Sequence, residues 1–122
     1  MKVITASLAG FALLAFSFCA QAAEVGGRYR VHGTNFDGSH YSGMAEVTVS
    51  SNTTCHIVWH IAGSTSKGIC MRVNDVLVAG YTMKGAVGLV AYKIKPSGVL
   101  DGVWTIADRD GAGTDVLTPV GE

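Results

Sequence analysis

The sequence predicts an all-β fold, a small antiparallel up-and-down meander of about eight strands that closes into a barrel. Three observations lead to this prediction. Apolar and polar residues alternate with a period of two in successive short segments, and the predicted mature chain carries no apolar pattern at helical spacing over three turns. Turns that contain glycine separate the segments. The 16 glycines in 122 residues are about twice ordinary usage, as expected of tightly curved strands.

Eight segments show the alternation. The first four strands are expected near 27–34, 39–50, 53–62 and 65–73. The last four are expected near 75–82, 86–95, 98–106 and 113–118. The connections are short and rich in Gly, Asn and Asp, which supply the positive φ of tight hairpins. Closure into a barrel, as in avidin-like and lipocalin-like proteins, removes the exposed edges of such a meander, whereas a sandwich usually needs longer crossing connections.

Residues 1–22 are interpreted as a secretory signal peptide and residues 23–122 as a single domain. Lys2 precedes an apolar run that ends in the small-residue pattern Ala20-Gln21-Ala22. This run is shorter than the roughly 18 residues of a spanning helix, which argues against a membrane anchor. The residues before Cys19 lack the pattern of a lipid-modified cysteine, so Cys19 is expected to leave with the signal. The mature form is expected in the periplasm or outside the cell, with no membrane span.

The charge balance and the motifs argue against several classes of function. Nine Lys and Arg balance nine Asp and Glu, so nothing indicates the capture of nucleic acid or of an anionic membrane. The chain lacks the Gly-x-Ser-x-Gly, Gly-x-x-x-x-Gly-Lys and His-Glu-x-x-His motifs. Glu46 is the only glutamate away from the two ends, and it lies among solvent-facing positions of its segment. We therefore expect no catalytic site and no cofactor.

Cys55 and Cys70 are the two cysteines of the predicted mature chain, and an exported protein is expected to join them in a disulfide. If the turn between them centres on Ala62 and Gly63, the two cysteines lie directly opposite each other on neighbouring strands. The bridge would close a loop of about 15 residues, which corresponds to roughly 3 kcal/mol of stability. That is a large share of the total for so small a domain.

The sequence around Cys55, Asn-Thr-Thr-Cys-His-Ile-Val-Trp-His, also contains two histidines and a tryptophan. In a strand, Cys55 and Trp59 share one face, and His56 and His60 share the other. Four residues of strand span about 13 Å, so the two histidines are too far apart to bind one ion. We interpret this segment as one wall of a barrel, with Trp59 inside.

Two other groups of polar residues admit a metal interpretation. His32 and His40 flank a turn through Phe36, which would place them opposite each other as a weak zinc or copper site or a pH-sensitive pair. The alternative is two surface imidazoles, because no third ligand follows at diagnostic spacing. The segment 108–115 has three carboxylates among glycines but lacks the closing glutamate of a calcium loop. We expect surface histidines, a simple turn in this segment, and no metal.

Six aromatic residues are expected to form the rings of the core: Tyr29, Tyr41, Trp59, Tyr81, Tyr92 and Trp104. Glycines inside the strand segments are expected to leave gaps for these rings, and they include Gly43, Gly68, Gly88 and Gly102. Six large rings would leave little free interior in a barrel of about 90 residues, which disfavours a carrier of small ligands.

A series of motifs runs through the chain: GRYRVHGTN from residue 27, CHIVW from residue 55, VGLVAY from residue 87 and GVWTIAD from residue 102. With GTDVLTP near the end, the series covers nearly the whole predicted mature chain, and it resembles a family of small exported bacterial proteins commonly labelled fibronectin-binding proteins. The resemblance implies a binding module whose strand edges or loop tips contact an extracellular protein such as fibronectin. Phe36 departs from the expected turn residue, and its ring could be exposed at the tip or packed down on the barrel.

Two functions from different classes remain. The first is a secreted or periplasmic non-enzymatic binding module, with Phe36, His32 and His40 as candidate contact residues and fibronectin or another extracellular protein as partner. The alternative is an inhibitor of a secreted protease or lysozyme, which would insert a terminus or a loop into an active site. Stoichiometric loss of enzyme activity without adhesion to a matrix would distinguish the inhibitor.

Overall fold

The computed structural model describes residues 24–121, so the predicted signal peptide and Cys19 lie outside the described residues. Each strand begins and ends within two residues of its predicted segment. The strands are β1 (Gly27–Thr34), β2 (His40–Val49), β3 (Cys55–Ile61), β4 (Ser64–Val73), β5 (Val76–Met83), β6 (Ala86–Ile94), β7 (Leu100–Ile106) and β8 (Gly113–Pro119).

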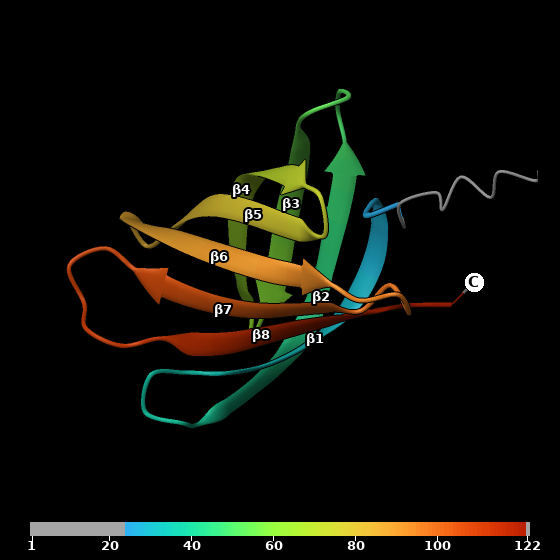
Figure 1. The fold of residues 1–122 in the computed structure, drawn as a ribbon. Coiled ribbons are helices and arrows are strands. Elements are labelled where there is room, and N and C mark those ends of the chain that lie inside the picture. The colour runs from blue at the N-terminus through green and yellow to red at the C-terminus, as the bar shows by residue number, and fades with distance from the viewer. Residues whose placement is uncertain (1–23, 122) are drawn as a thin grey trace, which may run out of the picture.

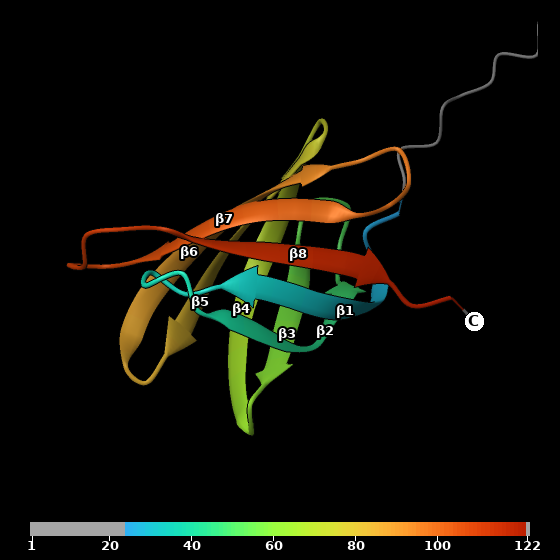
Figure 2. The ribbon, with the colours of Figure 1, turned by 90° about the horizontal axis from the view of Figure 1, so that it is seen from below.

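Every strand pairs antiparallel with its neighbours along the chain, and β8 pairs with β1. The sheet therefore closes into a barrel, which Figures 1 and 2 show in two perpendicular views. The predicted all-β meander and its closure are confirmed. The described residues form no helix, and thus none long and apolar enough to cross a membrane.

Tight turns with positive φ set the register of the hairpins. Ala62 and Gly63 between β3 and β4 have φ of 52° and 76°, and Lys84 and Gly85 between β5 and β6 have φ of 49° and 80°. Positive φ at both central residues is the geometry of the type I′ turn, whose twist matches that of the strands. The first of these turns places the two cysteines opposite each other, as predicted.

The two ends of the barrel differ in how they are filled. The end with the β2–β3, β4–β5 and β6–β7 connections is packed with apolar side chains. Its fully buried aliphatic residues are Val31, Ile57, Leu77, Leu100 and Leu117. Full burial of each such side chain contributes about 1.5–3 kcal/mol to folding. The other end, with the remaining four connections, is hollow; the β1–β2 and β7–β8 connections project together there in Figures 1 and 2.

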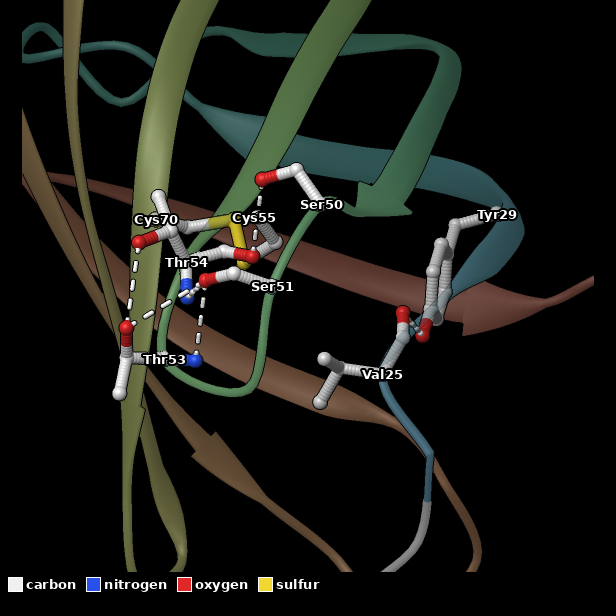
Figure 3. Close-up of a disulfide and its surroundings, with 8 residues drawn as sticks. All are labelled: Val25, Tyr29, Ser50, Ser51, Thr53, Thr54, Cys55 and Cys70. Carbon is white, nitrogen blue, oxygen red and sulfur yellow. Dashed lines mark hydrogen bonds between the residues drawn. A yellow bond between two sulfur atoms is a disulfide. The ribbon is translucent and has the colours of Figure 1, made fainter.

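A disulfide lies at the packed end. Cys55 at the start of β3 and Cys70 in β4 are cross-strand partners joined by an S–S bond of 2.04 Å, which confirms the predicted disulfide (Figure 3). The β2–β3 loop folds beside it, where the hydroxyl of Ser51 accepts hydrogen bonds from two backbone N–H groups of the same loop. The hydroxyl of Tyr29 donates to the carbonyl of Val25 at 2.5 Å, which fixes the segment that precedes β1.

Four aromatic rings lie directly over a glycine of the neighbouring strand. Tyr81 pairs with Gly88 across β5 and β6, and a Cβ added at Gly88 would lie 2.2 Å from the Tyr81 ring. Tyr92 covers Gly102 of β7 in the same way. The other two pairs are Tyr41 over Gly33 and Trp104 over Gly113. Because these positions have no side chain, the rings lie flat against the inner wall.

The outside of the barrel carries more exposed apolar side chains on β4–β7 than on β1–β3. Outward residues of β1–β3 include Arg28, Arg30, His32, Glu46, His56 and His60. Seven outward residues of β4–β7 are large, apolar and 39–62% exposed: Ile69, Met71, Val73, Val78, Val87, Leu89 and Val103. We call this second set the apolar outer wall. A shallow groove of about 800 Å³ lies across it.

Candidate functional site

The hollow end of the barrel contains a cavity of about 440 Å³. Aromatic and apolar side chains form most of its wall: Tyr41, Trp59, Ile61, Tyr81, Met83, Val90 and Trp104. The expectation that six rings leave little free interior is therefore wrong. Tyr29 lies toward the packed end, and the rings that cover glycines lie along the wall, so neither group crosses the lumen.

Asp115 of β8 is buried inside the barrel, with 4% of its surface exposed, and it lines the cavity. In the register of the sheet it pairs with Gly33 of β1 on one side and Gly102 of β7 on the other. Tyr41 and Tyr92 lie over these two glycines. The five residues form one continuous row across five strands, with the carboxyl group in the middle and a tyrosine at each end.

Three side chains donate hydrogen bonds to the carboxylate of Asp115. The hydroxyl of Tyr41 lies 2.7 Å from Oδ1, the hydroxyl of Tyr92 donates to Oδ2, and Nε1 of Trp59 lies 3.2 Å from Oδ2. An ionised carboxylate accepts about four hydrogen bonds. Oδ1 accepts only one from the described residues, so one acceptor position remains on a group that lines the cavity.

Burial changes the proton affinity of this cluster. Removal from water raises the pKa of Asp115, and the hydrogen bonds from Tyr92, Tyr41 and Trp59 act in the opposite direction. Burial first, and the charge of Asp115 second, raise the pKa of Tyr41 and Tyr92 and bring that of Tyr81 to about 12. The tyrosines therefore stay neutral near pH 7, and Asp115 is the one carboxylic acid of the cluster, with a pKa above that of a free aspartate.

Aromatic rings surround the cavity in two edge-to-face pairs. The ring centroids of Trp59 and Tyr81 are 5.2 Å apart, and those of Tyr41 and Trp104 are 6.5 Å apart. The hydroxyl of Tyr81 in β5 donates to the carbonyl of Thr105 in β7, two strands away, at 3.2 Å. Nε1 of Trp104 donates to the carbonyl of Thr114 in the neighbouring strand β8 at 3.1 Å. These bonds hold the rings in place, so the wall of the cavity is preorganised.

Phe36, the candidate contact residue of the β1–β2 turn, is packed down. Its ring stacks on Trp104 with centroids 4.8 Å apart, and the guanidinium carbon of Arg109 lies 4.9 Å from the centre of the ring. Of the two conformations that the sequence left open, the packed one is observed. Phe36 thus supports a wall residue of the cavity.

His32 and His40, the other two candidate contact residues, do not lie opposite each other. His32 pairs with Ser42 and His40 with Thr34, so the expected pairing is wrong. The reason is that the turn centres one residue later than Phe36. Both imidazoles are exposed, and residues 24–121 contain no group of three His, Cys, Asp or Glu that could hold a metal ion.

The acidic segment 108–115 divides between a loop and a strand. Asp108 and Asp110 are exposed in the β7–β8 loop, whereas Asp115 points into the barrel. The sequence analysis grouped the three carboxylates as one acidic cluster at a turn, although its strand 113–118 contains Asp115, and it did not predict that this carboxylate is interior. Alternation along β8 could have found it, because Asp115 lies two residues before the buried Leu117 and shares its face.

The fold and the site define an eight-stranded antiparallel barrel that is packed at one end and hollow at the other. No protein-family model and no curated protein matches the chain. Among solved structures it is similar to a redesigned β-barrel, mFAP1, bound to DFHBI, with 22% identity and a TM-score of 0.65 over 77% of this chain and 94% of that chain. It is also similar to a mutant of the fluorescent protein UnaG, with 12% identity and a TM-score of 0.52 over 79% and 96%. At these identities the similarity shows the fold alone.

Proposed function

We propose that this protein binds a small, largely aromatic molecule in the cavity at the hollow end of its barrel. The observation that carries the proposal is the cavity of about 440 Å³, walled by rings and containing one buried carboxyl group. Small-molecule sites have this character, since they are mostly apolar, hold a few fixed polar groups and occur in the mouths of β-barrels. The similar barrel mFAP1 was solved bound to DFHBI, which supports the use of such a fold for a small ligand.

The fixed rings favour binding because little order has to be created when the ligand enters. Tyr81 and Trp104 are held by hydrogen bonds to the backbone, and Trp104 is also covered by Phe36. A preorganised wall lowers the entropic cost of association. A flat ligand can therefore stack on existing surfaces, with its polar end directed to Asp115.

A cavity-filling variant tests this proposal. Ser66 faces inward opposite Trp59 and lines the cavity, whereas Lys67 faces outward on the same strand. We expect the oxidised protein to bind the neutral dye N-phenyl-1-naphthylamine saturably at one site, as measured by fluorescence titration. Ser66→Phe should weaken binding by about tenfold or more, which corresponds to about 1.4 kcal/mol, and Lys67→Phe should not. Dye binding that is absent, or unchanged in Ser66→Phe, would contradict the proposal.

A second candidate function is the predicted secreted protein-binding module, with fibronectin as the partner. The apolar outer wall favours it, because extended exposed apolar patches on soluble proteins commonly mark interaction surfaces. Saturable binding to immobilised fibronectin, lost in Leu89→Lys and kept in Thr118→Lys on β8, would support it; no binding above an albumin control would reject it. Inhibition of a protease or lysozyme stays a prediction.

A further inference from the structure

The carboxylate of Asp115 lies inside the barrel without a cationic partner among its contacts. Its three hydrogen-bond donors are Tyr41, Tyr92 and Trp59, and none of them carries a positive charge. A buried ionised carboxylate is unfavourable unless hydrogen bonds and an opposite charge compensate it. The protein supplies the hydrogen bonds, and no positive charge among residues 24–121 contacts this carboxylate, so a cationic ligand is a fitting source of the opposite charge.

The walls around Asp115 suit a positively charged, flat ligand. Trp59, Tyr81, Tyr41 and Trp104 present aromatic surface to the same cavity that Asp115 lines. Aromatic faces attract cations through the ring quadrupole, and they also stack on flat rings. A cavity walled by rings, with one acidic group inside, therefore combines two modes of recognising one kind of molecule.

Within the proposed function, on which this inference rests, we propose that the ligand carries a cationic nitrogen on a flat aromatic body, as an aryl amidinium does, and that an N–H of this cation donates to Oδ1 of Asp115. Such a charge-assisted bond is stronger than a neutral one. The ammonium group of Lys84, another residue that lines the cavity, is exposed to solvent. The positive charge of this ammonium group disfavours a second positive charge on the part of the ligand that lies near Lys84.

A pair of compounds that differ mainly in charge tests the inference. Naphthalene-2-carboxamidine is a cation, and naphthalene-2-carboxamide is its neutral counterpart of closely similar shape. We expect isothermal titration of the oxidised protein at about pH 8 to show about tenfold or tighter binding of the amidine. Asp115→Asn should abolish this preference, whereas Asp110→Asn, which changes an exposed carboxylate of the β7–β8 loop, should keep it.

The outcomes separate this inference from the proposed function. Equal binding of the two compounds overturns the inference and leaves small-ligand binding in place. A preference for the amidine that survives in Asp115→Asn also overturns it, because the charge is then recognised elsewhere. If neither compound nor the neutral dye binds, the proposed function fails as well.

A pH profile of the unaltered protein tests the same point without a variant. Burial raises the pKa of Asp115, so the preference for the amidine should shrink as the pH falls from about 8 to about 4. The other titratable groups that face Asp115 are Tyr41, Tyr81 and Tyr92, whose raised pKa values keep them neutral over this range. Lys84 is exposed to solvent, and the four histidines lie exposed on the outside of the barrel. A preference that does not change with pH would overturn the inference.

Discussion

Asp115 is tolerated inside the barrel because residues from other strands surround its carboxyl group with donors. Gly33 and Gly102, its two cross-strand partners, carry no side chains, so the rings of Tyr41 and Tyr92 can lie over them and reach the two carboxylate oxygens. Either glycine with a Cβ would push a tyrosine out of this position. The polar centre of the site thus depends on the two smallest residues of the row.

At the residue scale we predict the effect of removing one donor. Tyr92→Phe keeps the buried ring but deletes the hydroxyl that donates to Oδ2 of Asp115, so the free energy of unfolding should fall by about 1–3 kcal/mol. Loss of this bond should also raise the pKa of Asp115 further, since the bond favours the charged form. Urea unfolding and NMR titration of the Asp115 carboxyl carbon measure the two effects.

The sign of the pH dependence follows from the raised pKa of Asp115. Its contribution to stability is complete below the pKa of the unfolded chain and is lost as the pH rises through the higher pKa of the folded protein. Tyr92→Phe should extend this loss to higher pH. Tyr29→Phe serves as the control, because its hydroxyl donates to the carbonyl of Val25 and makes no contact with Asp115. An Asp115 pKa that is the same in both variants would refute the prediction.

At the scale of strands, aromatic rings pack on the inner wall where the cross-strand partner is a glycine. Tyr81 covers Gly88 between β5 and β6, and Tyr92 covers Gly102 between β6 and β7. Gly80 of β5 differs, because it faces outward and a Cβ there would meet only Leu89 at 3.8 Å, an ordinary contact. The β5–β6 pair thus contains one glycine, Gly88, that the ring of Tyr81 requires, and another, Gly80, at which a side chain would fit.

We predict that Gly88→Ala lowers the free energy of unfolding by about 1–3 kcal/mol, because the new methyl group overlaps the rigid ring of Tyr81. Gly80→Ala should be neutral, or stabilising by about 0.4–1 kcal/mol through the reduced entropy of the unfolded chain. Chemical denaturation of the two variants side by side measures the difference. Equal stabilities would mean that the ring moves freely, and would remove this explanation of the glycine pattern.

The strands and the disulfide could be predicted because local sequence encodes them. A period of two identifies a strand, and the turn at Ala62 and Gly63 sets the register that pairs Cys55 with Cys70. The pairing of His32 could not be predicted with the same certainty, since a turn centre displaced by one residue changes every partner. The β1–β2 connection contains Asn35, Asp37 and Gly38, all of which suit turn positions, so its composition does not determine where the turn centres.

The cavity and the set of residues around its carboxylate were missed because they depend on the closed barrel. The row through Asp115 joins residues as far apart in sequence as Gly33 and Asp115, and no local pattern reports that they meet. The six predicted core rings were known from the sequence, but their orientation was not. Rings that lie flat on glycines leave a cavity, whereas the same rings directed across the lumen would fill it.

At the scale of the whole molecule, the two ends of the barrel have different roles. The packed end holds the fully buried aliphatic side chains and the disulfide, which stabilise the fold. The hollow end holds the cavity, with one buried carboxyl group and few apolar residues between the rings. Stability and the proposed binding therefore depend on different residues, and a change at one end can leave the other intact.

This separation predicts the effect of removing the disulfide. Replacing both cysteines, Cys55→Ala and Cys70→Ala, should lower the free energy of unfolding by roughly 3 kcal/mol, because the bridge closes a loop of 15 residues and restricts the unfolded chain. The protein that remains folded should bind N-phenyl-1-naphthylamine with unchanged affinity, since neither cysteine lines the cavity. Urea unfolding measures the first effect, and dye titration at low temperature, with circular dichroism to establish the folded fraction, measures the second. Weaker dye binding by the fully folded double variant would show that the packed end shapes the cavity, and would contradict the separation of stability and binding between the two ends.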